Sequence, residues 1–235
     1  MWGTERRRQG DDVMNLEKLA ADAATSPPDL QLIESPCDFF LEGPLSTLPL
    51  EVTKIFKELQ VLTTFVTGRS YDSQNADPNH SDFLIDVNAC EFYMYKFVHD
   101  PEFVLDMRFK GPGPTWSAYP IAGTIYLYLF LRQIPLSNTI YEYCAGYLRE
   151  ALEDAKAVDI ASERYPPEAL FWVLIFGGSI SRGQKYGPWF RFHAKNIKEL
   201  LNLQTWDDAC QVLEHFVYCR EIGDVYCRAF WDELN

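Results

Sequence analysis

The sequence predicts an all-α protein, an irregular helical domain with a buried aromatic-rich central helix. Three observations support this prediction. Apolar residues recur at helical spacing almost everywhere after residue 30, and no segment of any length alternates apolar and polar residues as a half-buried strand does. Aromatic residues make up 15% of the 235 residues. They are dense in segment 166–190, PPEALFWVLIFGGSISRGQKYGPWF, which we expect to form the centre of the core.

The chain divides into two parts on this interpretation. Residues 1–30 mix an arginine triplet at 6–8, an acidic pair and Ser26-Pro27-Pro28, and we expect them to be a poorly ordered N-terminal segment. Residues 31–235 are expected to form one all-α domain. We find no internal repeat of fixed period, because the predicted helices differ in length and pattern.

In the first half of the chain, the spacing of apolar residues and the positions of helix-breaking residues predict the helices. Segment 52–66 has one apolar face, with Pro49 near its start. A polar loop at 71–80 precedes a second helix that begins near Ser81 or Asp82 and ends at Asp100-Pro101. The sequence KGPGP at 110–114 is the clearest breaker. Segment 118–131 is apolar on nearly all sides and predicts a buried helix.

Helices in the second half are predicted in the same way. Ser137 is expected to cap a helix whose buried face is Ile140, Cys144, Tyr147, Leu148, Ala151 and Ala155. Two prolines, at 166 and 167, begin the next helix, where prolines are tolerated. The glycines at 177 and 178 either end this helix or allow another helix to pack close to it.

Three further helices complete the prediction. The first is marked by an apolar face at His193, Ile197, Leu200 and Leu201. Thr205-Trp206-Asp207-Asp208 resembles a capping box with Asp in place of Glu. The helix behind it is expected to bury Trp206, Ala209, Cys210, Leu213, Phe216 and Val217. A short last helix is expected over 225–234.

Charge and hydropathy exclude several classes of function. The formal net charge is -13, which disfavours direct binding to nucleic acid or to an anionic membrane surface. No apolar run reaches the roughly 20 residues of a spanning helix. The N-terminus has basic residues but no apolar stretch behind them, so it does not read as a secretory signal. We therefore expect a soluble, intracellular protein with protein partners.

The sequence contains none of the common motifs of catalysis or of metal binding considered below. The six cysteines form no CxxC pair, and the four histidines form no HExxH. Cys219, Cys227 and His215 are spaced only loosely for a metal site. Asp207-Asp208 is explained by the first turn of a helix, and there is no GxSxG, P-loop or GxGxxG. We therefore predict no catalytic residue, no metal ligand, no cofactor and no DNA-binding residue.

The aromatic residues allow one candidate ligand site. Tyr126, Tyr128, Phe176 and Phe190 could line a pocket for a small apolar effector. Core packing is the competing interpretation and the more common role of aromatic residues at helical spacing.

The segment 166–190, together with LNLQTWDDACQVLEHFVYCREI and AFWDEL, resembles the C-terminal regulatory region of the fungal binuclear zinc-cluster (Zn2Cys6) transcription factors. Upstream, AYPIAGTIYLYLFLRQIP is similar to that family's aromatic-aliphatic helix. The matching motif residues, which we call the family motif, are Pro167, Leu170, Phe171, Trp172, Gly177, Gly178, Pro188, Trp189, Phe190, Thr205, Trp206, Asp207, Trp231 and Glu233.

The resemblance implies a function in transcription regulation in the nucleus. The family's zinc cluster, with its CxxCxxxxxxC spacing, is not present in this sequence, and neither is the coiled-coil segment that usually follows it. We therefore expect a truncated form, a regulatory domain without its own DNA-reading module. It would act through contacts with the transcriptional machinery or a DNA-binding partner, or by sensing a small apolar effector. The alternative is a soluble all-α enzyme or carrier that binds an apolar molecule in an aromatic-lined core.

Overall fold

A computed structural model describes residues 44–69, 80–100, 116–157 and 165–235 of the chain. All of these residues belong to one compact unit, 40–235. The segment predicted to be poorly ordered, 1–30, lies outside the described residues, as does the breaker at 110–114. All the regular elements in the described ranges are helical, which confirms the predicted fold class.

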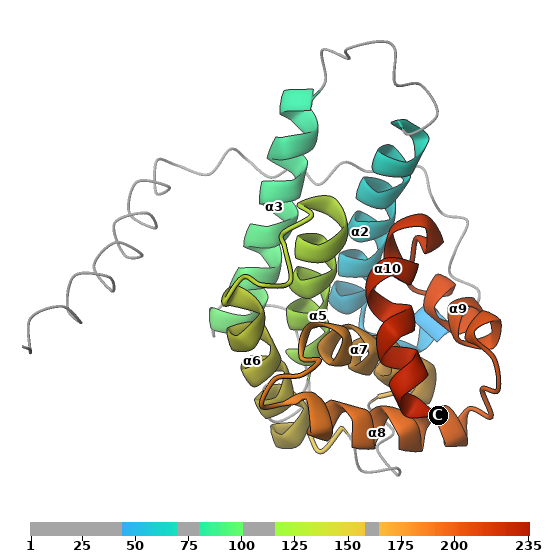
Figure 1. The fold of residues 1–235 in the computed structure, drawn as a ribbon. Helices are drawn as coiled ribbons and strands as arrows, with labels where there is room; N and C mark the ends of the chain where they lie inside the picture. The colour runs from blue at the N-terminus through green and yellow to red at the C-terminus, as the bar shows by residue number, and fades with distance from the viewer. Residues whose placement is uncertain (1–43, 70–79, 101–115, 158–164) are drawn as a thin grey trace, which may run out of the picture. The chain divides into compact units, whose positions relative to one another are not determined.

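The first half contributes helices that pack side by side (Figure 1). A 3-10 turn, η2 (Pro44–Thr47), precedes α2 (Leu50–Arg69) and α3 (His80–His99). Both long helices lie close to their predicted bounds. They pack against α5 (Ala118–Tyr126), which continues into a π-helical turn, η3 (Leu127–Leu131).

The second half contributes five helices and a final turn. They are α6 (Ile140–Asp154), α7 (Pro167–Ile180), α8 (Gly187–Leu200), α9 (Trp206–Glu214), α10 (Arg220–Trp231) and the 3-10 turn η4 (Asp232–Leu234). None of the helices in the described ranges is long and apolar enough to cross a membrane.

The central element is α7, as the sequence predicts. Every residue from 169 to 180 is buried, and α5, α6, α8, α9 and α10 all pack against this helix. Pro167 is its first residue, a position where the missing amide hydrogen costs nothing. The helix runs through the glycine pair to Ile180, so the glycines do not end it.

Two local predictions about helix starts and faces are wrong. Ser137 does not cap α6; the helix begins at Ile140, whose amide donates instead to Asn138 Oδ1 at 3.0 Å. The buried face of α6 is also rotated, because it includes Tyr141 and Ala145, whereas Tyr147 is 57% exposed. The Tyr141 hydroxyl donates to the Ile134 carbonyl at 2.8 Å, which holds this face toward the core.

The remaining helices differ from the prediction mainly at their ends. In α8 the predicted face member Leu200 is 49% exposed, and Ala194 is buried instead. The last helix begins at Arg220, five residues before its predicted start. The capping box before α9 is confirmed, since Thr205 Oγ1 accepts from the Asp208 amide and Asp208 accepts from the Thr205 amide.

Candidate functional site

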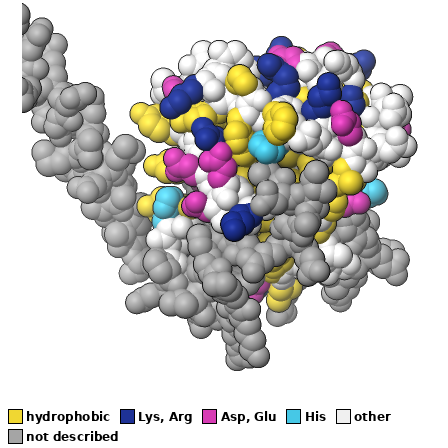
Figure 2. Space-filling model, turned by 90° about the horizontal axis from the view of Figure 1, so that it is seen from below, with side chains coloured by type: hydrophobic (Ala, Val, Ile, Leu, Met, Phe, Trp, Pro, Cys, Tyr) yellow, Lys and Arg dark blue, Asp and Glu magenta, His cyan; other side chains and the backbone are white. Residues whose placement is uncertain are grey.

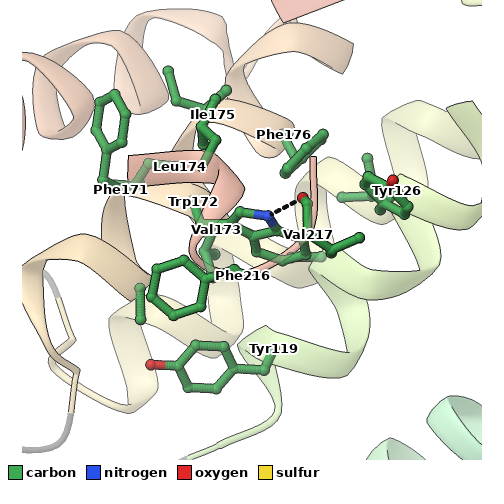
Figure 3. Packing of buried hydrophobic residues seen from close by; sticks show 14 of the residues in the cluster. Tyr119, Tyr126, Phe171, Trp172, Val173, Leu174, Ile175, Phe176, Phe216 and Val217 are labelled. Carbon is green, nitrogen blue, oxygen red and sulfur yellow. Dashed lines mark hydrogen bonds between the residues drawn. The ribbon is translucent and has the colours of Figure 1, made fainter. Parts of the chain in front are cut away.

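Trp172 lies at the centre of the core and is fully buried (Figure 3). Its ring centroid is 4.9 Å from that of Phe56, 4.7 Å from that of Phe176 and 6.3 Å from that of Tyr126. Its Nε1–H donates a hydrogen bond of 2.8 Å to the carbonyl oxygen of Val217. This one side chain of α7 therefore packs against α2 and α5, and it is hydrogen-bonded to the segment that follows α9.

The glycine pair allows two phenylalanine rings to approach the backbone of α7. A Cβ atom at Gly177 would lie 2.4 Å from Phe190 Cε1 and 2.8 Å from Leu148 Cδ2. A Cβ atom at Gly178 would lie 2.1 Å from two ring carbons of Phe230. Real side chains do not approach this closely, so both positions require glycine. Of the two predicted roles of these glycines, the structure selects close packing.

The motif prolines and Trp189 occupy the ends of helices. Pro188 lies in the first turn of α8, as Pro167 does in α7. Trp189 follows Pro188 and is only half-buried. Its ring contacts that of His193, with 4.4 Å between centroids. These residues therefore set where the two helices begin and cover the outer side of α8.

Two motif tryptophans close the core where α9 meets α10. The rings of Trp206 and Trp231 are 5.9 Å apart, and Trp231 also meets the edge of Phe171 at 6.3 Å. The Trp206 Nε1–H donates to Asp224 Oδ1 at 3.2 Å, and the Tyr218 hydroxyl donates to the same oxygen at 3.0 Å. One carboxylate thus satisfies two polar atoms at the edge of an aromatic cluster.

Glu233, the last motif residue, links η4 to two other segments. Its carboxylate accepts from Arg182 at 2.8 Å and from Arg191 at 2.5 Å. The hydrogen bond from Arg182, followed by that from Arg191, lowers the pKa of Glu233 below its ordinary value. The family motif is therefore explained by structural roles around α7.

Two tyrosines of α5 form a natural comparison, because both are fully buried and only one hydroxyl is paired. The hydroxyls of Tyr126 and Thr63 share a hydrogen bond of 2.7 Å, whereas the Tyr119 hydroxyl finds no partner among the described residues. We expect Tyr126→Phe to lower the free energy of unfolding by about 1–2 kcal/mol. Tyr119→Phe should leave it unchanged or raise it, because an unsatisfied buried hydroxyl is removed. Urea denaturation measures both, and equal losses would contradict the assignment.

The described cysteines are free thiols. Burial is the largest cause that raises their pKa values, to about 11 or 12, for Cys90, Cys144, Cys210, Cys219 and Cys227. They are therefore protonated at neutral pH, and a thiol is a poor nucleophile and metal ligand in that form. The loosely spaced set of Cys219, Cys227 and His215 does not come together as a metal site, and the described ranges contain no such group of three or more ligating side chains.

A surface pocket of about 150 Å³ lies where α3, α5, η3 and α6 meet. Its lining is mostly apolar and includes three tyrosines; the residues are Glu91, Met94, Tyr95, Val98, His99, Ile121, Thr124, Tyr128, Cys144 and Tyr147. Tyr95 and His99 are one turn apart on α3, with 4.5 Å between their ring centroids. The pocket is therefore a hollow with aromatic walls and a small number of polar atoms, which is the usual composition of a small-molecule site.

Glu91 is the acidic group of this pocket, and two partners hold it in place. Its carboxylate accepts from the Tyr128 hydroxyl at 2.6 Å and from Arg132 at 2.5 Å. Arg132 also donates to Asn88 at 2.6 Å. Burial, and then the hydrogen bond to Glu91, raise the pKa of Tyr128, so its phenol stays protonated and donates. The carboxylate therefore has a fixed orientation and retains lone pairs for a further donor.

The structure does not bring the four predicted effector residues together around this pocket. Tyr128 lines it, but Tyr126, Phe176 and Phe190 are fully buried in the core. The rings of Tyr126 and Phe176 meet edge to face at 5.5 Å, and Phe190 fills the space above Gly177. Core packing, the competing interpretation, accounts for these three.

Sequence reasoning missed most of the pocket. Glu91, Tyr95 and His99 recur every four residues and so share one face of α3, which is the available signal. In the sequence, that face has the mixture of polar and apolar residues typical of the solvent-exposed side of an amphipathic helix. The spacing in α6 predicts a face with the wrong rotation, which places Tyr147 in the core.

Comparison of the chain with protein-family models, with curated protein sequences and with solved structures finds no match.

Proposed function

We propose that the chain is a regulatory domain of the fungal zinc-cluster type, which acts in gene regulation in the nucleus. The observation that best supports the proposal is the convergence of the family motif. Its residues come from α7, α8, α9, α10 and η4, yet Trp172, the glycine pair and Trp231 all contribute to one core around α7. This convergence supports the resemblance, because motif residues that are far apart in the sequence pack into one core.

The charge of the chain supports a protein partner rather than direct contact with DNA. A net charge of -13 repels phosphate, and the family's zinc-cluster spacing is not present in the sequence given. On the face shown in Figure 2, basic side chains are interspersed with acidic and hydrophobic ones. This domain is therefore proposed to regulate through contacts with protein partners.

The pocket supports a second element of the proposal, the sensing of a small effector. Its volume of about 150 Å³ suits a molecule about as large as benzene, and its lining comes from several helices that pack together. The same pocket favours the alternative, an all-α carrier. A carrier would bind its ligand with no effect on transcription, so the two functions are separated by a transcription assay.

A tethered reporter assay tests the proposal. The full chain is fused to an unrelated DNA-binding domain in a fungal host whose reporter gene carries the matching site. We expect reporter output to rise or fall relative to the DNA-binding domain alone. The same fusion with Trp172→Ala, which removes the centre of the core, should return the output to that baseline. A folded, nuclear fusion that leaves the reporter unchanged would contradict the proposal.

A further inference from the structure

The pocket between α3, α5 and α6 combines an apolar lining with side chains that attract positive charge. Three of its walls are tyrosines, Tyr95, Tyr128 and Tyr147, and its acidic group is Glu91. No lysine or arginine is among the described residues that line it. Aromatic rings and carboxylates both attract cations, so these side chains favour a positively charged occupant over a neutral or negative one.

The carboxylate of Glu91 is available to such an occupant even though Arg132 pairs with it. Arg132 binds one oxygen of the carboxylate from outside the lining and divides its donors between Glu91 and Asn88. The Tyr128 hydroxyl binds the other oxygen. A carboxylate accepts about four hydrogen bonds, so these two donors do not saturate it, and its attraction for an ammonium group that lacks N–H groups is electrostatic. The pKa of Cys144 is raised to about 11 by burial, so that thiol adds no charge.

The dimensions of the pocket limit the size of the occupant. A cavity of about 150 Å³ accepts a molecule about as large as benzene. Met94, Val98 and Ile121 provide an apolar floor for methyl or methylene groups. A compact ammonium group that carries alkyl substituents has this combination of size, apolar surface and positive charge.

We propose that this pocket binds a small organic cation, an alkylated or quaternary ammonium group. The inference rests on the proposed function, because it names the chemical class of the effector. It differs from the sequence-based expectation in two respects: the site is at the α3–α5–α6 surface rather than in the aromatic core, and the ligand is charged rather than purely apolar.

Calorimetric titration of the full chain with two matched compounds tests the charge requirement. Choline is the cation, and 3,3-dimethylbutan-1-ol is its neutral counterpart of the same shape. We expect saturable binding of choline and about tenfold weaker binding of the alcohol, since a cation–π contact in a partly desolvated site is worth on the order of 1–2 kcal/mol. Equal affinities, or no saturable binding of choline in the millimolar range, would overturn the proposal.

Matched variants of α6 test the position of the site. Tyr147 lines the pocket, whereas Tyr143 lies one turn away outside the lining and is similarly exposed, 68% against 57%. Tyr147→Leu should weaken choline binding severalfold, and Tyr143→Leu should leave it unchanged. Because both residues are at the surface, both variants should melt near the parent temperature. If Tyr143→Leu weakens binding as much as Tyr147→Leu does, the ligand binds elsewhere.

Glu91→Gln separates the carboxylate from the aromatic walls. The amide oxygen can still accept from Tyr128, but the negative charge is lost, so choline should bind several times more weakly while the alcohol is unaffected. An unchanged affinity for choline would remove Glu91 from the site. Choline binding by a fusion that is silent in the reporter assay would refute the proposed function and leave the site intact. An active fusion with no choline binding would refute the site alone.

Discussion

Gly178→Ala is expected to lower the free energy of unfolding by at least about 3 kcal/mol, the upper part of the range for overpacking a rigid core. The added Cβ would lie 2.1 Å from two carbons of the Phe230 ring, and α10 would have to move away from α7 to relieve the clash. Guanidinium denaturation with far-UV circular dichroism measures the change.

Gly68→Ala is the matched control for that substitution. Gly68 lies in the last turn of α2, and a Cβ there meets no atom within 4 Å. The same change of residue should therefore raise the free energy of unfolding, by up to about 1 kcal/mol, because alanine favours the helix. A loss at Gly178 no larger than 1 kcal/mol would show that Phe230 does not pack on the backbone of α7.

Trp172→Ala is expected to cost about 4 kcal/mol, within the range measured for removing a fully buried tryptophan. The variant leaves a cavity between Phe56 and Phe176 and also removes the donor to the Val217 carbonyl. A domain of ordinary stability, about 5–15 kcal/mol, would lose a large part of it. Thermal melting and denaturant titration report the loss directly.

Trp189→Ala serves as the comparison for Trp172, because both tryptophans belong to the family motif. Trp189 is only half-buried and lies on the outer side of α8, so its removal should cost less than half as much. If both variants melt within a degree or two of the parent protein, neither ring is part of the core and the structural interpretation of the motif is wrong.

Much of the fold was predictable because strong local signals agree with the packing. Prolines at 166 and 167 and an unbroken apolar run identify α7, and its burial on all sides follows from the absence of a polar face. Thr205 and Asp208 satisfy each other's backbone amides, so the start of α9 is specified by four residues. Such features need no knowledge of the partner helices.

The errors arise where tertiary contacts decide between similar local choices. The last helix is predicted to begin at 225, yet α10 begins at Arg220 and contains Gly223, where a Cβ would be 2.4 Å from the Tyr218 ring. In α6, Tyr141 and Tyr147 are equally plausible core residues by spacing; the hydrogen bond from Tyr141 to Ile134 favours the first. That rotation also places Tyr147 at the pocket.

The pocket itself could not be predicted, because it is a property of three helices together. Glu91 and Tyr95 occupy positions that look like solvent-facing surface in α3, whereas the spacing in α6 predicts Tyr147 on the buried face. Only the packing of α3 and α6 against α5 brings them around one hollow. By contrast, three of the four aromatic residues predicted to line a site fill the core instead, since Tyr126, Phe176 and Phe190 are fully buried.

The occupancy of chromatin by the native protein tests the central claim most directly. The chain is tagged at its own locus, crosslinked in growing cells and immunoprecipitated with its DNA. Regulation through a DNA-binding partner predicts enrichment at discrete promoters, and this enrichment should disappear in the Trp172→Ala variant. A stable, folded protein that crosslinks to no promoter above the untagged control would contradict the account, and it would favour a carrier or enzyme built on the same helices.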